Sequence, residues 1–169
     1  IKLSGMKEVA FLRSPVAHGR IRGFDIPENL RSQVTIAADM DGVKAIRAVT
    51  ALPGFNVSEQ PALATDKVRY VGDVVAMCLA PDRAKAEDIV QQISVGIEEL
   101  TAIHDMVQAR DAGTPLIHEQ WNENVFLESV VDDPKFDEIA AKAPVKVTRT
   151  FRTARQCMSP IEGRGVVAE

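Results

Sequence analysis

The sequence contains only two cysteines, Cys78 and Cys157, and they lie far apart without a Cys-x-x-Cys spacing. We expect neither a disulfide framework nor an iron–sulfur site within this chain, because both need clustered cysteines. Reduced thiols are the ordinary state of cytosolic cysteines, so the expected location is cytoplasmic.

An excess of positive charge and long apolar runs are also missing. The chain has 20 lysine and arginine residues against 24 aspartate and glutamate residues, which gives a formal net charge of −4 at pH 7. Nucleic acid is not an expected partner, because phosphate binding depends on clustered lysine and arginine. No apolar run approaches membrane-spanning length, and no signal-like segment opens the chain, so no membrane partner is expected.

Motifs for zinc sites and for hydrolases are absent as well. His18, His104 and His118 lack the helical pairing and the neighbouring cysteines or carboxylates of a zinc site. We expect His18 to cap the chain or to pack beside Pro15. No Gly-x-Ser-x-Gly elbow supports a catalytic serine. We therefore assign no catalytic residue and no metal ligand within the chain.

Residues 67–100 are the most informative stretch, and they predict a strand, a tight turn, a strand, a helix and a strand. A glycine-aspartate turn at residues 72–73 separates two β-branched and apolar runs. Asp82 is placed to cap the helix, and the spacing changes to alternation at residues 93–97, which predicts a strand. The apolar positions of the helix share one face: Ala86, Ile89, Val90 and Ile93.

The pattern before this stretch predicts mainly strands. Strands are predicted at residues 8–13 and 19–25, and we expect these two to pair as a hairpin-like unit. A short helix is predicted at residues 34–40 and a strand at residues 43–49. Residues 55–64 have no clear period and are expected to form a surface loop.

Turn-forming residues at 111–124 indicate a connector between two structural units. We place the first domain at residues 1–112 and the beginning of a second, incomplete domain at residues 113–169. The chain opens on isoleucine rather than methionine and stops inside an expected strand, so we expect it to be a piece of a longer protein.

Beyond the connector, the pattern again mixes strands with a helix. Strands are predicted at residues 125–131 and 144–153, and Asp133-Pro134 is expected to open a helix between them. Across the whole chain, the mixture of elements indicates an α/β (α+β) fold class.

Three segments, in this order, carry a family resemblance. Residues 11–21, FLRSPVAHGRI, contain an arginine-serine-proline-x-alanine-histidine sequence. Residues 68–76, VRYVGDVVA, precede the capped helix and the IEEL of the next strand. Residues 152–165, RTARQCMSPIEGRG, place an arginine-glutamine pair before a proline-x-glutamate-x-arginine-glycine sequence. Together they resemble the catalytic (large, molybdopterin-binding) subunits of the molybdenum hydroxylases, the family of xanthine dehydrogenase, aldehyde oxidase and carbon monoxide dehydrogenase.

The resemblance implies an α/β hammerhead domain at residues 1–112 and the start of the first molybdopterin-binding domain at residues 113–169. It implies an oxidoreductase that hydroxylates an aldehyde or an N-heterocycle with a molybdenum-pyranopterin cofactor, molybdopterin cytosine dinucleotide. Electrons would pass through [2Fe-2S] clusters to FAD on partner subunits or domains. The implied partners are the remainder of the catalytic subunit, the iron–sulfur and FAD subunits, and a small-molecule substrate. We expect this segment alone to hold no cofactor and to be inactive.

The resemblance also implies one cofactor-binding residue. In the family, a glutamine six residues before the motif's glutamate lies beside the oxo ligand of the molybdenum, and Gln156 has that place relative to Glu162. An amide can donate to an oxo group without adding charge. The alternative is a glutamine at a strand end that bonds only to backbone.

The substrate and the class of function stay open. Met158 stands where many relatives have histidine or an aromatic residue, so we do not choose among carbon monoxide, aldehydes, purines and other heterocycles as substrate. A second function, of a different class, is a noncatalytic assembly or protein-interaction module with a hammerhead-like fold. Four arginines form either a solvated strand face or a patch that faces an anionic cofactor or a partner subunit: Arg149, Arg152, Arg155 and Arg164.

Overall fold

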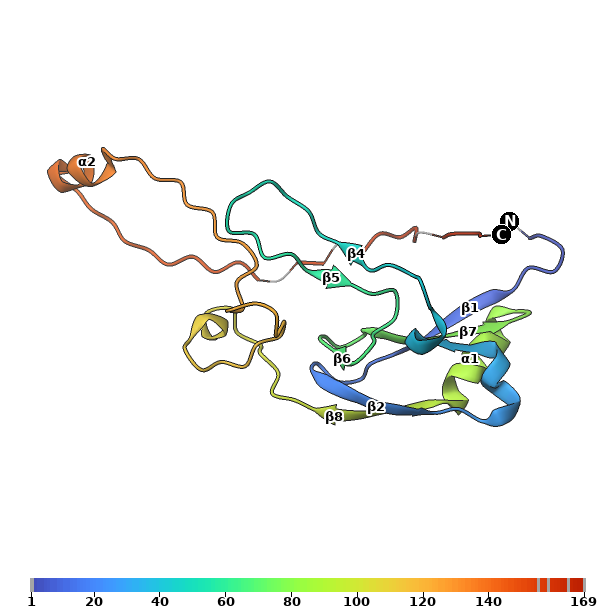
Figure 1. Cartoon of the computed structure of the whole chain (residues 1–169). Coiled ribbons are helices and arrows are strands. Elements are labelled where there is room, and N and C mark those ends of the chain that lie inside the picture. The colour runs from blue at the N-terminus through green and yellow to red at the C-terminus, as the bar shows by residue number, and fades with distance from the viewer. Residues whose placement is uncertain (1, 155, 158, 164, 169) are drawn as a thin grey trace. The chain divides into compact units, whose positions relative to one another are not determined.

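A computed structural model describes residues 2–154, 156–157, 159–163 and 165–168 of the chain (Figure 1). The chain divides into two compact units, Ile1–Ser129 and Val130–Glu169. The strands all belong to the first unit: β1 (Glu8–Arg13), β2 (Gly19–Asp25), β3 (Val34–Ile36), β4 (Ile46–Arg47), β5 (Glu59–Gln60), β6 (Lys67–Val68), β7 (Val74–Ala80) and β8 (Ser94–Glu99). The helices are α1 (Arg83–Gln92) and α2 (Phe136–Lys142), with short 3-10 helices η1 (Glu28–Gln33), η2 (Ala37–Asp39) and η3 (Gln108–Arg110).

The strands form three antiparallel sheets, in the orders β1-β7-β3, β6-β2-β8 and β4-β5. The predicted hairpin of residues 8–13 and 19–25 is wrong, because β1 pairs with β7 whereas β2 pairs with β6 and β8. The chain turns away at Ser14, whose N–H donates to the Asp73 carbonyl at 2.8 Å. That contact holds the segment between the two strands against a distant turn and sends each strand into a different sheet.

The order of β6, β7, α1 and β8 confirms the prediction for residues 67–100, but β6 ends at Val68 rather than at the predicted turn. Asp82 caps α1, because its Oδ1 accepts a hydrogen bond from the Lys85 N–H at 2.9 Å. The apolar face of α1 packs on one face of the β1-β7-β3 sheet. In Figure 1, the green ribbons of α1 and β7 lie side by side. The centre of this core is buried and built from small and branched side chains: Ala10, Val34, Ala76, Cys78, Ala86 and Ile89.

The other face of β7 packs against the second sheet. Val75 is fully buried beside Val68 and Ala64. Because successive side chains of a strand point to opposite faces, Val75 serves this second core while Ala76 serves the first. Side chains from β2 and β8 complete the layer: Ile21, Phe24, Val95 and Ile97. The run of apolar residues in β7 is therefore explained by burial on both sides.

Two predictions between β2 and β6 are wrong. Residues 34–40 do not form one helix, since β3 pairs with β7 and only Ala37–Asp39 takes a 3-10 turn. The first residues of that stretch are β-branched, and such residues favour a sheet over a helix. The strand predicted at residues 43–49 is reduced to β4, which pairs with β5 inside the stretch expected to be a loop.

In the second unit, α2 confirms the helix predicted after Asp133-Pro134. The strands predicted at residues 125–131 and 144–153 are wrong, because both stretches are irregular. Alternation alone does not make a strand, since the backbone N–H and C=O groups also need a neighbouring ladder. The described residues from 130 onward contain no strand that could supply one.

The first unit extends past the predicted connector. Residues 113–129 stay with the first unit because they contact it, for example through the Asn56 N–H, which donates to the Phe126 carbonyl at 2.7 Å. The assignment of residues 113–169 to a molybdopterin-binding domain stays a prediction. Among the described residues, neither α1 nor α2 has the length and apolar character of a membrane-spanning helix.

Candidate functional site

The first two resemblance segments meet in the fold. Arg13 Nη1 donates to the Gly72 carbonyl at 2.9 Å, and the Gly72 N–H donates to the Ser14 carbonyl at 2.8 Å. Ser14 is buried, and its Oγ accepts from the Val16 N–H at 3.2 Å. These contacts explain the arginine-serine pair and the glycine turn as a structural joint between β1 and the turn before β7.

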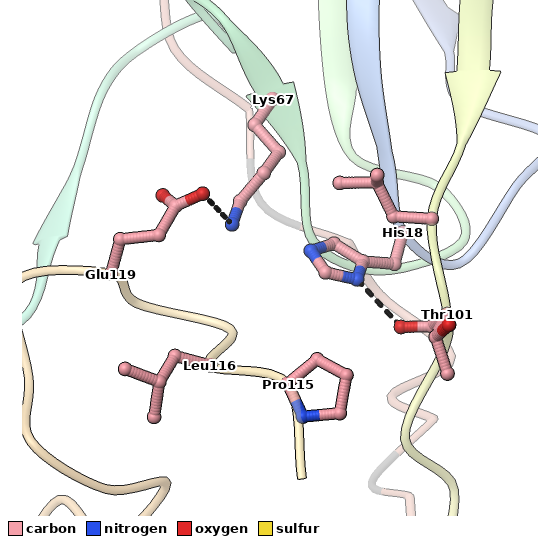
Figure 2. A pocket seen from close by; sticks show the side chains of 7 residues that line it. His18, Lys67, Thr101, Pro115, Leu116 and Glu119 are labelled. Carbon is pink, nitrogen blue, oxygen red and sulfur yellow. Dashed lines mark hydrogen bonds and ion pairs between the residues drawn. The ribbon is translucent and has the colours of Figure 1, made fainter. Parts of the chain in front are cut away.

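A hollow of about 430 Å³ lies at the end of β2, β6 and β8 (Figure 2). His18 enters it directly before β2, and its Nδ1 lies 2.8 Å from the Thr101 carbonyl oxygen. Sequence reasoning expected His18 to cap the chain or to pack beside Pro15, and it did not foresee this longer-range contact with Thr101. Side chains from the chain after β8 and from the connector close the hollow: Leu100, Pro115, Leu116 and Glu119.

Lys67, the first residue of β6, is the charged centre of this region. Its side chain is fully buried, and its Nζ makes an ion pair with Glu119 Oε1 at 3.1 Å. Glu119 Oε1 also accepts from Arg20 Nη2 at 3.0 Å. The Lys67 ammonium, helped by Arg20 and Arg69, holds the pKa of Glu119 below its usual range. The carboxylate of Glu119 thus stays ionised and ties the connector to β2 and β6.

A second hollow, of about 270 Å³, shares Lys67 with the first and lies beside Arg69, Tyr70 and His118. Burial, followed by the neighbouring charge of Asp73, raises the pKa of Tyr70. Burial, followed by the charges of Arg69 and Lys67, lowers the pKa of His118. Both side chains are therefore neutral near pH 7, and the charged side chains that line this hollow are Lys67 and Arg69, with Glu59 and Asp73.

Sequence reasoning missed the Lys67–Glu119 cluster. A lysine at the start of a strand and a glutamate in a connector carry no local pattern, and they meet only because the connector folds back. Within the described residues, no group of three or more histidine, cysteine, aspartate or glutamate side chains is placed to hold a metal ion.

The predicted cofactor-binding residue, Gln156, lies in the second unit in irregular chain, and its side chain is exposed. Glu162 is also exposed in irregular chain. Three residues of the same motif lie outside the described residues: Arg155, Met158 and Arg164. Exposed side chains of this kind do not enclose a cofactor, so we derive no reaction step through the molybdenum group from them.

Two separate three-stranded antiparallel sheets pack against each other, and α1 covers the other face of the β1-β7-β3 sheet; this arrangement defines the first unit as a mixed α/β hammerhead domain. Residues 1–101 match the family described as aldehyde oxidase and xanthine dehydrogenase, a/b hammerhead domain. The chain belongs to this family and corresponds to the hammerhead segment of the large subunit of molybdenum hydroxylases.

Individual relatives agree with this assignment. The chain is 29% identical to the nicotine 6-hydroxylase large subunit of Paenarthrobacter nicotinovorans, over 100% of the chain and 21% of that protein. It is 28% identical to the carbon monoxide dehydrogenase large chain of Hydrogenophaga pseudoflava, over 99% and 22%. The solved aldehyde oxidoreductase of Desulfovibrio gigas superposes with a TM-score of 0.73 and 25% identity, over 85% of the chain and 16% of that structure. The chain spans about a fifth of the length of these curated relatives.

Proposed function

We propose that the protein to which this chain belongs oxidatively hydroxylates a small molecule, an aldehyde or an N-heterocycle, with a molybdenum-pterin cofactor. The observation that carries the proposal is the match of the entire chain to a hydroxylase large subunit, on a fold that pairs β1 with β7 and β2 with β8. When bound, the cofactor supplies the redox chemistry of the hydroxylation.

In this proposal, the hammerhead domain is a scaffold and an interface rather than the reacting centre. Two of the motif and cluster contacts in it are structural, namely Arg13 with Gly72 and Glu119 with Arg20. Gln156 would bring a neutral amide to the molybdenum once the remainder of the subunit surrounds it. The cytosine dinucleotide form of the cofactor, the [2Fe-2S] and FAD partners and a cytoplasmic location are further parts of the proposal.

The substrate stays open because the relatives differ. Their names refer to nicotine, carbon monoxide and aldehydes. Substrate preference depends on residues that line the reacting pocket. A substrate panel therefore has to include an N-heterocycle, an aldehyde and carbon monoxide.

The test is purification of the full-length protein, coexpressed with its neighbouring subunits in cells that supply molybdate. We expect molybdenum and pterin to copurify in stoichiometric amounts, and one member of the panel to drive reduction of an artificial electron acceptor. Cells grown without molybdate provide the control for adventitious activity. A correctly folded, fully matured complex without molybdenum or pterin would contradict the proposal and favour the noncatalytic assembly module.

A further inference from the structure

A buried imidazole and a buried ammonium face the larger hollow. His18 is 4% exposed and Lys67 is 1% exposed. Within the described part of the chain, His18 Nε2 has no hydrogen-bond partner. Figure 2 shows this nitrogen and the Lys67 side chain directed toward the same space. Buried polar atoms without a partner are rare in folded proteins, so the hollow is a candidate binding site.

The Thr101 carbonyl decides which group His18 presents to the hollow. A carbonyl oxygen only accepts hydrogen bonds, so Nδ1, 2.8 Å from the Thr101 oxygen, carries a proton, and in the tautomer with one ring proton Nε2 carries none. Nε2 then faces the hollow as an acceptor. A ligand that satisfies His18 therefore offers it an O–H or N–H donor.

Lys67 sets the opposite requirement. An ammonium has three N–H donors, and Glu119 lies within ion-pair distance of Lys67 on one side only. The remaining donors need an acceptor oxygen. The same ligand group must therefore accept from Lys67 and donate to His18.

The local charge favours an anion. Arg20 and Lys67 share the single carboxylate of Glu119, which leaves an excess of positive charge. Arg69 lines the second hollow together with Glu59 and Asp73. The excess charge at the larger hollow is therefore that of Lys67 and Arg20 against Glu119. Charge-assisted hydrogen bonds to an oxyanion are the stronger kind.

We propose that this hollow binds a hydrogen phosphate group, either as inorganic phosphate or as the monoester of a small organic molecule. One phosphate oxygen accepts from Lys67 Nζ, and the phosphate hydroxyl donates to His18 Nε2. At about 430 Å³, the hollow falls within the usual range of small-molecule sites, about 300–1,000 Å³. Its apolar wall would contact the organic part of an ester: Leu100, Pro115 and Leu116.

The first test uses the wild-type, full-length protein in its complex. Thermal unfolding is followed while inorganic phosphate or sulfate is added near pH 6 at constant ionic strength, because a phosphate monoester has a second pKa of about 6 and still carries its hydroxyl on about half of the molecules there. We expect a saturable rise in Tm with phosphate and a much smaller one with sulfate, because sulfate carries no proton to donate to His18. No saturable response to phosphate or to phenyl phosphate would overturn the site, and equal responses to phosphate and sulfate would overturn the donor–acceptor assignment.

Phenyl phosphate separates the two sources of the ligand. Tighter binding of phenyl phosphate than of inorganic phosphate indicates an ester, because the phenyl ring buries apolar surface on the wall of the hollow. Tighter binding of inorganic phosphate indicates the free ion. Both results support the site and differ only in what fills it.

The second test removes the ammonium. Lys67→Met keeps the length of the side chain, and we expect it to weaken phosphate binding by about tenfold or more, as loss of a hydrogen bond to a charged group does. Lys85→Met, on the exposed surface of α1, is the matched control and should bind phosphate as the wild type does. Undiminished binding by Lys67→Met would overturn the proposal.

Because Lys67 is buried, its variant can fail to fold. In that case, a crystal structure of the wild-type complex grown with phosphate decides: phosphate between Lys67 and His18 supports the site, and water alone overturns it. Molybdenum content is measured in the same preparations. Phosphate binding at this site does not depend on the molybdenum content. A negative phosphate result can therefore be told apart from a failure of the proposed hydroxylase activity.

Discussion

Gly19 lies so close to the backbone of Glu98 that a β-carbon at Gly19 would come within 2.9 Å of the Glu98 carbonyl oxygen. Gly19 pairs with Glu99 across β2 and β8, and Glu98 is the next residue of β8, near the hollow that contains His18. The nearby Ile97 side chain could rotate away from such a carbon, but a carbonyl in a sheet ladder cannot. The glycine that follows His18 is therefore required by this close approach.

Gly19→Ala should lower the free energy of unfolding by about 1–3 kcal/mol, the usual cost of overpacking. Gly96→Ala, in the facing strand, is the matched control, because its β-carbon would lie 3.8 Å from the nearest atom, the Gly23 carbonyl oxygen. We expect that control to be neutral or slightly stabilising. The midpoints of urea unfolding, at an unchanged m-value, measure both effects. Equal midpoints for the two variants would contradict this account of Gly19.

The Asp82 cap should make the stability of α1 depend on pH. The hydrogen bond from the Lys85 N–H holds the pKa of Asp82 below its usual 3.8. Because the pKa of Asp82 is lower in the folded chain, the unfolded chain takes up the proton first as pH falls. The stabilisation by the cap is therefore complete above the unfolded-state pKa and is lost as pH falls through the folded-state pKa. Asp82→Ala should lower Tm near pH 7 more than Asp82→Asn does, because an amide oxygen still caps.

The measurement is the difference in Tm between wild type and Asp82→Asn, followed from about pH 7 to about pH 2. That difference should vanish at the acid end, where both side chains are uncharged. A difference that stayed constant over this range would show that the charge of Asp82 does not stabilise the cap.

The elements predicted correctly are those whose signals are local. β7, α1 and β8 lie within one stretch of sequence, and the apolar run, the Asp82 cap and the change of period each act over a few residues. Strand partners are different. β1 and β2 look alike by pattern, and the choice of β7 as the partner of β1 depends on contacts such as Ala10 with Cys78, far apart in sequence.

The residues of the candidate sites also differ in how far a local sequence pattern could predict them. The contact of His18 with Thr101 crosses 83 positions of sequence, and the Lys67–Glu119 pair depends on how the connector folds back. No residue pattern encodes either contact. Gln156, by contrast, was predicted from a family motif, and its proposed role stays a prediction, because the chain spans 21% of the length of the nicotine 6-hydroxylase large subunit.

His118 should report its own protonation through Trp121. The two rings stack with centroids 4.2 Å apart, and burial with the charges of Arg69 and Lys67 lowers the pKa of His118 below its usual 6.5. A protonated imidazole quenches indole fluorescence, so the Trp121 signal should fall only at pH values below 6.5. The difference spectrum between wild type and Trp121→Phe isolates this signal.

The same shift predicts the direction of a stability change. The unfolded chain binds the His118 proton at a higher pH than the folded chain does. The contribution of His118 to the free energy of unfolding is therefore complete above its usual pKa of 6.5 and falls as pH decreases below 6.5. His118→Phe should remove both the fluorescence step and this part of the pH dependence. A fluorescence midpoint at or above 6.5 would contradict the lowered pKa.

Gln156→Ala, made in the full-length complex, tests the proposed contact with the cofactor. Gln156 is exposed in the segment itself, so the fold should lose little stability. Outer-shell partners of a metal commonly contribute about 10–100-fold to activity or metal affinity, and we expect kcat/KM to fall by a factor in that range. Gln91→Ala, which removes an exposed glutamine from α1, should leave kcat/KM unchanged. Equal activity of both variants, at equal molybdenum content, would remove Gln156 from the proposed site.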